Sequence, residues 1–171
     1  MSQIKVFLFG INNAGKTAFS KTMKNEKVIE TEPTIVFDIT KWVIKNLEFA
    51  VWDAPGQVKF RAAWREGLDK AQVLLFVLDT TDKVRFEEAK RELDTVLNLY
   101  ETARIPLIIC FHKMDLPEAK ANHDRAREIL KVPLIRNRKV YPFDTSIKIP
   151  ATLNAVKDKL AEIIQKARWS S

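Results

Sequence analysis

The run Gly10-Ile11-Asn12-Asn13-Ala14-Gly15-Lys16-Thr17 constrains this chain more than any other feature. It matches the pattern G-x-x-x-x-G-K-[ST], which forms a phosphate-binding loop between a strand and a helix. The apolar segment Ile4–Phe9 precedes the run and the helix-compatible segment Thr17–Lys24 follows it, as the pattern requires. The alternative is an ordinary glycine-containing turn before a helix, and this setting disfavours it. We therefore expect a phosphate site at this turn.

Each residue type in the run has a physical role beside a phosphate group. Glycines permit a tight turn that brings backbone N–H groups close to phosphate oxygens, and the helix that starts near Gly15 adds the positive end of its dipole. Lys16 supplies a charge for the outer phosphates, and the Thr17 hydroxyl can bind Mg²⁺. The residues expected to contact a nucleotide here are Asn13, Ala14, Gly15, Lys16, Thr17 and Ala18.

A second motif, Asp53-Ala54-Pro55-Gly56-Gln57, follows the apolar segment Leu47–Trp52. An aspartate at the end of a strand can hold Mg²⁺, usually through water. Gly56 can bring a backbone N–H to a γ-phosphate, and Gln57 stands where it can orient an attacking water. Such a motif alone is often only a turn, but the phosphate loop upstream favours the nucleotide interpretation.

A third motif, His112-Lys113-Met114-Asp115, follows another apolar segment. The Asp115 carboxylate can accept two parallel hydrogen bonds from N1–H and N2–H of guanine, which adenine does not offer, while the Lys113 stem can lie over the base. The alternative is a polar loop at the end of a strand. The later segment Asp144–Ile147 can direct backbone N–H groups at the guanine carbonyl, or can simply cap a helix. The expected base-binding residues are His112, Lys113, Asp115, Ser146 and Ile147.

Thr34, within Glu32-Pro33-Thr34-Ile35, can reach Mg²⁺ and a γ-phosphate from a mobile loop that loss of the phosphate would release. The alternative is an ordinary threonine at the start of a strand. With Thr34 included, the expected metal ligands are Thr17, Thr34 and Asp53, and the expected catalytic residues are Lys16, Thr34 and Gln57.

Apolar strand-like segments alternate with helical patterns along the chain, which predicts an α/β fold. We expect a single doubly wound, mostly parallel six-stranded sheet with helices on both faces and ligands at the carboxyl ends of the strands. A hairpin turn is predicted at Lys45-Asn46. The expected strands are Ile4–Phe9, Phe37–Ile44, Leu47–Trp52, Val73–Leu78, Ile105–Phe111 and Val140–Phe143, and the expected helices cover Thr17–Lys24, 86–100, Ala119–Lys131 and 153–167.

The composition fits a globular chain and sets limits on its partners. The net charge is +7, which suits an anionic partner or merely a lysine-rich surface; the compact basic cluster 136–139 is too short to indicate nucleic-acid binding. No apolar run approaches the about 20 residues of a membrane span. The single cysteine, Cys110, lies in an apolar run, typical of a buried residue in a reducing compartment.

We therefore expect a cytoplasmic protein. The sequence has no secretory signal, Ser2 does not fit a myristoylation motif, and no cysteine is placed for prenylation. No lipid anchor is expected, and peripheral membrane contact stays open.

Five motifs in this order resemble those of the small Ras-like GTPases, over essentially the whole chain. The resemblance is closest to the Arf family at Gly10–Thr17, Glu32–Ile35, 45–57, Trp64-Arg65 and 113–119. His112-Lys113-Met114-Asp115 and Thr145-Ser146-Ile147 look more like Rag GTPases, which carry histidine where most relatives have asparagine. The resemblance implies one G-domain over residues 1–171 that binds GTP or GDP with Mg²⁺. It also implies effector, exchange-factor and GTPase-activating partners, and a monomer or nucleotide-dependent dimer.

The chain departs from the Arf pattern in ways that bear on function. It lacks the lipid-bearing N-terminal amphipathic helix, so Arf-style membrane insertion is not expected. Phe37 and Trp52 match two positions of an aromatic trio that resembles Arf effector surfaces, but the third is Gly67. Ala54-Pro55 stands where a small-residue or glycine pair is more usual; its proline removes an N–H and stiffens the segment.

Three functional hypotheses follow. The first is a switch that slowly hydrolyses GTP; no arginine is obviously placed to assist in cis, so an activating partner is expected to supply one. The second is a constitutively nucleotide-bound interaction module with little hydrolysis or switching, motivated by Ala54-Pro55. The third, a phosphate-loop kinase, leaves Asp115 without a purpose.

Overall fold

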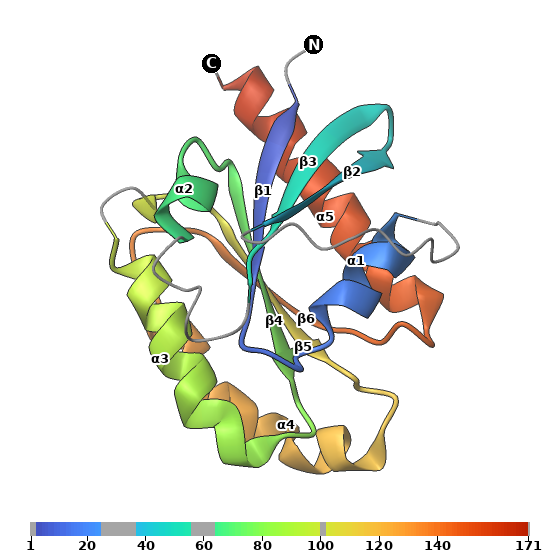
Figure 1. Ribbon diagram of the computed structural model, residues 1–171, viewed down its shortest axis with the longest axis vertical. Helices are drawn as coiled ribbons and strands as arrows, with labels where there is room; N and C mark the ends of the chain where they lie inside the picture. Colours follow the sequence, from blue (N-terminus) through green and yellow to red (C-terminus); the bar gives the residue numbers. More distant parts are fainter. Residues whose placement is uncertain (1–2, 25–36, 56–63, 100–101, 171) are drawn as a thin grey trace.

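The computed structural model describes residues 3–24, 37–55, 64–99 and 102–170, and within them strands and helices alternate (Figure 1). The strands form one six-stranded sheet in the order β2-β3-β1-β4-β5-β6, in which only the β2–β3 pair is antiparallel. The predicted fold class is therefore confirmed. The strands are β1 (Ile4–Phe9), β2 (Asp38–Ile44), β3 (Leu47–Asp53), β4 (Val73–Asp79), β5 (Leu107–His112) and β6 (Val140–Asp144). The helices are α1 (Lys16–Met23), α2 (Trp64–Leu68), α3 (Phe86–Leu97), α4 (Pro117–Leu130) and α5 (Pro150–Trp169), with single 3₁₀ turns η2 (Lys83–Arg85) and η4 (Val132–Leu134).

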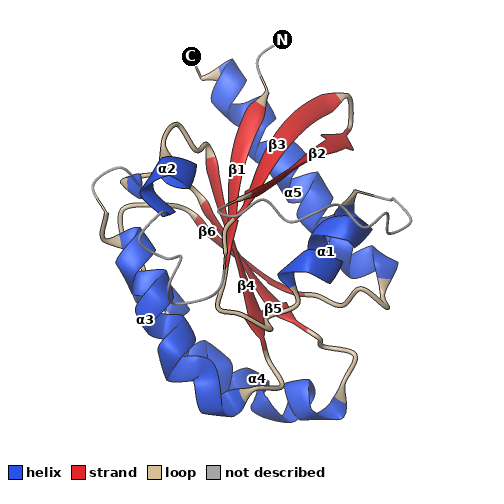
Figure 2. Ribbon diagram, viewed as in Figure 1, coloured by secondary structure: helices blue, strands red, loops and turns tan. Residues whose placement is uncertain are grey.

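Helices cover both faces of the sheet (Figure 2). The core on one face is built with side chains of α1 and α5, and the core on the other face with side chains of α2, α3 and α4. Strand β5 is buried along its whole length and β4 at all but its last residue. Their continuous apolar runs follow from this double covering, because neither side of a central parallel strand faces water.

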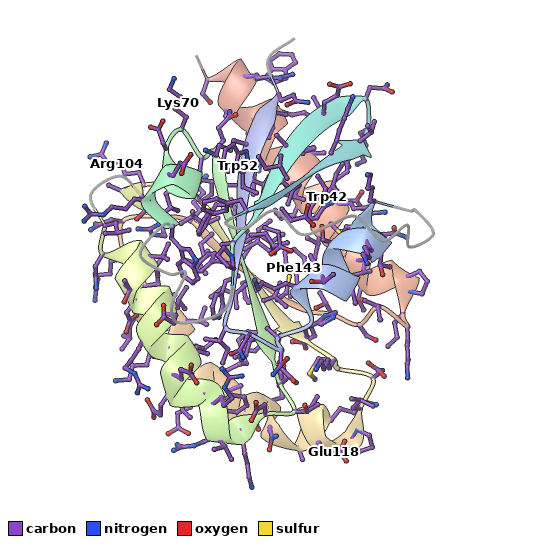
Figure 3. All side chains as sticks on the ribbon, viewed as in Figure 1. Trp42, Trp52, Lys70, Arg104, Glu118 and Phe143 are labelled. Atoms are coloured by element: carbon purple, nitrogen blue, oxygen red, sulfur yellow. The ribbon has the colours of Figure 1, made fainter. Side chains whose placement is uncertain are left out.

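The antiparallel strand β2 lies at the edge of the sheet, and its alternation of side chains is that of an edge strand. Trp42 points into the core beside α1, whereas its neighbour Val43 is 63% exposed. Lys45 and Asn46 form the β2–β3 turn with φ angles of 49° and 65°, the two positive values of a tight hairpin turn. Trp42 and Trp52, labelled in Figure 3, belong to the cores on opposite faces of the sheet.

The carboxyl ends of the parallel strands gather at one edge of the sheet. Asp53 at the end of β3 lies beside Leu8 of β1, and Asp79 at the end of β4 lies beside His112 at the end of β5. In Figure 1 this edge is at the bottom of the view, and both chain termini are at the top. The loops that carry the sequence motifs therefore start from the same edge.

The structure corrects several predicted element boundaries. Strand β5 begins at Leu107 rather than at residue 105, and α4 begins at Pro117 rather than at residue 119. The earlier start of α4 has a physical cause, since proline suits the first turn of a helix, where its missing N–H is not needed. The short helix α2 and the 3₁₀ turns were not predicted, because each is too short to establish a hydrophobic period.

The basic cluster 136–139 has a structural role through Arg138. Its guanidinium donates hydrogen bonds to the carbonyl oxygens of Leu97, Thr102 and Ile105 at 3.0–3.2 Å. Leu97 ends α3, so its carbonyl is one that the helix itself leaves without a partner, whereas Thr102 and Ile105 lie between α3 and β5. These contacts within the fold account for the position of this cation.

Gly67 in α2 is required by the packing of an aromatic ring. A Cβ atom added to Gly67 would lie 2.5 Å from a ring carbon of Phe37 and 2.9 Å from one of Phe7. The Phe37 ring is buried in this position and meets the Trp52 ring edge-on, with centroids 5.5 Å apart. Gly67 stands at the third position of the aromatic trio, and its lack of a side chain makes room for the ring of Phe37 at the first position.

Gly67→Ala should lower the free energy of unfolding by about 1–3 kcal/mol through overpacking. Helix propensity alone predicts the opposite sign, a gain of about 1 kcal/mol, so urea denaturation separates the two effects. Adding Phe37→Leu to Gly67→Ala should recover part of the loss. A Gly67→Ala variant more stable than the wild type would show that the ring does not occupy this space.

Candidate functional site

The phosphate-loop motif forms a tight turn between β1 and α1. A Cβ added to Gly10 would lie 2.5 Å from the carbonyl oxygen of Val77, and Gly15 has a φ of 93°, which disfavours any side chain. The first main-chain hydrogen bond of α1 runs from the N–H of Phe19 to the carbonyl of Gly15, at 2.9 Å. The N–H groups of residues 16–18 therefore have no carbonyl to bind within the helix, as at an anion site. The predicted contact residues from Asn13 to Ala18 lie together on this turn.

Lys16 and Asp53 form an ion pair at the centre of this edge. The Lys16 ammonium lies 3.3 Å from Oδ1 of Asp53 and also donates a hydrogen bond to the carbonyl of Ala54. Only 10% and 11% of the two side chains are exposed. Burial raises the pKa of the Asp53 carboxyl, while the Lys16 charge acts in the opposite direction. A predicted phosphate ligand and a predicted metal ligand are thus in contact.

The oxygen donors here suit a hard divalent cation. The Thr17 hydroxyl is in the first turn of α1, next to Lys16, and the Asp53 carboxylate ends β3; Mg²⁺ prefers such oxygen ligands and usually keeps waters or takes phosphate oxygens for the rest. Within the described ranges no group of three or more histidine, cysteine, aspartate or glutamate side chains can hold a metal ion.

Three hydrogen bonds hold the Ala54-Pro55 segment. The Ala54 N–H donates to the Leu8 carbonyl at 2.8 Å, its carbonyl accepts from Lys16, and the Pro55 carbonyl accepts from the Trp64 indole N–H at 3.0 Å. The predicted residues Gly56, Gln57 and Thr34 lie outside the described residues.

The third motif and the segment after β6 form one joined loop pair. The Ser146 hydroxyl donates to Oδ1 of Asp115 at 2.7 Å, and this hydrogen bond lowers the pKa of the Asp115 carboxyl. The Met114 N–H donates to the Thr145 carbonyl at 3.0 Å. The Lys148 ammonium lies 3.7 Å from the second oxygen of Asp115. The structure therefore brings Asp115 and Ser146, two of the residues predicted to bind the base, into contact.

His112 lies between the phosphate loop and this loop pair. Its Nδ1 lies 2.8 Å from the Thr145 hydroxyl oxygen, and its ring meets the Phe19 ring edge-on, with centroids 5.4 Å apart. A Cβ on Gly15 would lie 3.1 Å from the His112 ring. The ring is 3% exposed, and its burial, helped by the Lys113 charge, lowers the pKa of His112 to about 4. A neutral ring thus joins the two loops.

Asp79 was missed by the sequence analysis. Its Oδ2 lies 2.7 Å from the Lys113 ammonium, and its Oδ1 accepts from the N–H and hydroxyl of Thr81 at 2.9 and 2.6 Å. Burial opposes the effect, but the hydrogen bonds from Lys113 and Thr81 lower the pKa of the Asp79 carboxyl. The signal was present, because Asp79 follows an apolar run just as Asp53 does.

The contact between Arg85 and Asn12 was also missed, and it has no sequence signal. Arg85 precedes α3, and its guanidinium reaches the phosphate loop across 73 residues of sequence. Nothing in the spacing of the two residues indicates that they meet.

The whole arrangement corresponds to a known family. The model of the Arf (ADP-ribosylation factor) family matches residues 1–164. The chain belongs to the ADP-ribosylation factor family. A solved structure, the Arl6 BBS3 small GTPase from Trypanosoma brucei with bound nucleotide analogue GppNp, superimposes with a TM-score of 0.82. It is 22% identical, and the match covers 99% of this chain and 100% of that one.

These findings confirm the predicted resemblance to small Ras-like GTPases and to the Arf family among them. Members of the Arf family are guanine-nucleotide-binding switches, so the edge that carries Lys16, Asp53 and Asp115 is the candidate nucleotide site. In the part of the chain that the structure describes, no helix is both long and apolar enough to cross a membrane.

His112 should make this Arf-family protein sensitive to acid. The ordinary histidine pKa is 6.5 and that of His112 in the fold is about 4, so below pH 6.5 the unfolded chain binds a proton that the folded protein does not. The stability from the neutral ring is complete above pH 6.5 and is lost as the pH falls toward 4, by about 3 kcal/mol.

Urea unfolding of the wild type and of His112→Asn at pH 7 and pH 4 checks this expectation. Asparagine does not titrate, so the stability of the variant relative to wild type should rise by about 3 kcal/mol on acidification. The other titrating groups are shared by both proteins and cancel in the comparison. Parallel stability profiles would contradict a neutral buried ring.

Proposed function

We propose that this Arf-family protein is a molecular switch that binds GTP and GDP with Mg²⁺ and slowly hydrolyses GTP. The observation that carries the proposal is the arrangement at one sheet edge: a phosphate loop with Lys16 and Asp53, and a loop pair with Asp115 and Ser146, joined by buried His112. The proposal treats residues 1–171 as one nucleotide-binding domain.

Base recognition is assigned to Asp115 and its supporting groups. A carboxylate with a lowered pKa is ionised and acts only as an acceptor. The two N–H groups on one edge of guanine match such an acceptor, whereas adenine lacks this donor pair. The Ser146 hydroxyl fixes the carboxylate, and the Lys113 stem is assigned to the face of the base. Because the Ser146 N–H donates to the Thr152 hydroxyl at 3.0 Å, the Ile147 N–H is assigned to the guanine carbonyl. In this proposal His112 substitutes for the asparagine of most relatives by supporting both loops.

Phosphate binding and hydrolysis are assigned to the other half of the site. Backbone N–H groups of residues 13–18 donate hydrogen bonds to the phosphate oxygens. The Lys16 ammonium leaves its ion pair with Asp53 and binds the outer phosphates. Mg²⁺ held by Thr17, Thr34 and Asp53 would neutralise charge on the phosphates. Gln57 orients the attacking water, and slow turnover is expected because an arginine from an activating partner is the usual source of a further 10³–10⁵-fold acceleration.

Asp115→Ala should remove the preference for GTP over ATP. Without the carboxylate, the two guanine N–H groups lose their acceptor, and GTP affinity should fall about 10²-fold while ATP affinity stays low. Isothermal titration with Mg²⁺ and each nucleotide provides the measurement.

Asp124→Ala is the matched control for this variant, since Asp124 is a fully exposed aspartate of α4, and GTP affinity should be unchanged. Equal affinity of the wild type for GTP and ATP would mean that 112–115 does not recognise the base. The chain would then be a general phosphate-loop nucleotide binder.

Gln57→Leu should slow hydrolysis by about tenfold or more without weakening GTP binding, because leucine cannot orient water. Single-turnover release of phosphate gives the rate, and titration of a non-hydrolysable GTP analogue gives the affinity. Turnover equal to that of the wild type would remove Gln57 from the mechanism.

The proposal carries further consequences for partners and location. Effector, exchange-factor and GTPase-activating proteins are expected, the protein is assigned to the cytoplasm, and no nucleic-acid partner is invoked. The proposal leaves room for peripheral membrane contact. It also allows two oligomeric states, a monomer and a nucleotide-dependent dimer. The similarity of the motif that contains His112 and Asp115 to that of Rag GTPases is also part of this proposal.

A second candidate function rests on Ala54-Pro55. Its carbonyl and N–H groups are bound by Lys16, Leu8 and Trp64, which favours a nucleotide-bound interaction module with little switching. Amide exchange over residues 27–68 separates the two candidates. Equal exchange with GDP and with a GTP analogue would favour the module, and different exchange would favour the switch.

A further inference from the structure

Arg85 connects the start of α3 to the phosphate loop. Its Nη1 donates a hydrogen bond to the main-chain carbonyl of Asn12 at 2.7 Å, and its Nη2 donates to the side-chain oxygen of the same residue. The other edge of the guanidinium faces Glu88, with Nε and Nη2 at 3.0 and 3.2 Å from its two oxygens. Only 24% of the arginine side chain is exposed. Arg85 is thus fixed between α3 and the loop.

This contact determines how one peptide group of the loop is turned. The peptide between Asn12 and Asn13 is trans, since the described residues contain no cis peptide bond. In a trans peptide the carbonyl and the N–H point in opposite directions. Because Arg85 holds the Asn12 carbonyl toward itself, the Asn13 N–H points away from Arg85. Asn13 itself has a φ of 64°, a conformation found where successive N–H groups form an anion-binding hollow.

The shape of the guanidinium explains why an arginine stands here. Two acceptors of one residue, a main-chain carbonyl and a side-chain amide oxygen, match the planar fork of donors that a lysine ammonium lacks. The charge of Arg85 is already compensated by Glu88. Its effect on a nucleotide therefore passes through Asn12 and does not require contact with a phosphate.

We propose that Arg85 is a positioning residue for the nucleotide phosphates, holding the Asn12–Asn13 peptide so that the Asn13 N–H faces them. This inference rests on the proposed function, since it assumes that the loop binds GDP and GTP. It assigns a role to an arginine within the chain that is distinct from the arginine expected from an activating partner.

The test compares GDP with guanosine, which carries the same base and no phosphate. Arg85→Ala should weaken GDP binding about 10- to 100-fold, the scale of one hydrogen bond to a charged group, and leave guanosine binding unchanged. Arg85→Lys keeps the charge without the fork, so GDP binding should stay weakened. Titration calorimetry measures GDP, and NMR titration measures the weaker guanosine. Thermal unfolding verifies that each variant is folded.

Arg125→Ala is the matched control. Arg125 pairs with Glu128 three residues along α4, as Arg85 pairs with Glu88 three residues along α3, but it does not contact the phosphate loop. Its removal should leave GDP affinity at the wild-type value. An equal loss in this variant would mean that general positive charge is responsible, and would overturn the assignment.

Three other results would also overturn the role of Arg85. These are an unchanged GDP affinity in Arg85→Ala, an equal loss of GDP and guanosine affinity, and full recovery of GDP affinity in Arg85→Lys. A wild-type protein that binds guanosine and GDP separates this failure from failure of the proposed function. A wild type that binds neither would overturn the proposed function, and the inference with it.

Discussion

The parallel alignment of β1, β3, β4, β5 and β6 is the constraint on which the site depends. It places the carboxyl ends of five strands at one edge, so that residues far apart in the sequence become neighbours. Asp53 and Asp79 stand in equivalent positions, each following a buried apolar run, and each receives a lysine from another loop. The apolar interior of the sheet makes these pairs necessary, because an isolated charge at the rim of a core is costly. The parallel arrangement of the strands therefore determines both the fold and the positions of these charged residues.

Most of the fold could be predicted from the sequence because its signals are local. Short stretches of sequence are enough to recognise the apolar runs of β4 and β5 and the helical spacing in α3 and α5. The alternation of strands and helices then restricts the topology. What failed were short elements and boundaries. A helix of five residues such as α2 gives less than two turns of pattern, and the start of α4 depends on the special behaviour of Pro117.

The site could be predicted only as far as its motifs extend. Lys16, Asp53 and Asp115 stand at fixed spacings that have a chemical reason, and the structure brings Lys16 and Asp53 into contact and Asp115 beside Ser146. Arg85 and Asn12 come into contact because α3 packs against the sheet, and no local sequence pattern indicates this contact. The space that Gly67 leaves for the Phe37 ring is of the same kind. Contacts of this type cannot be predicted from local sequence patterns, because they depend on the angle at which two elements pack.

The ion pairs at this edge also bear on how a nucleotide and a cation would bind. Lys16 and Asp53 satisfy each other in a largely buried position, so neither can leave without a replacement. A phosphate that bound the Lys16 ammonium would leave Asp53 with its pKa raised by burial and with no cation beside it, and a divalent cation held by Asp53 would restore that balance. In the proposed function, phosphate and cation would therefore favour each other through the same pair. The coupling between nucleotide and Mg²⁺ would follow from two charges that the fold has placed 3.3 Å apart.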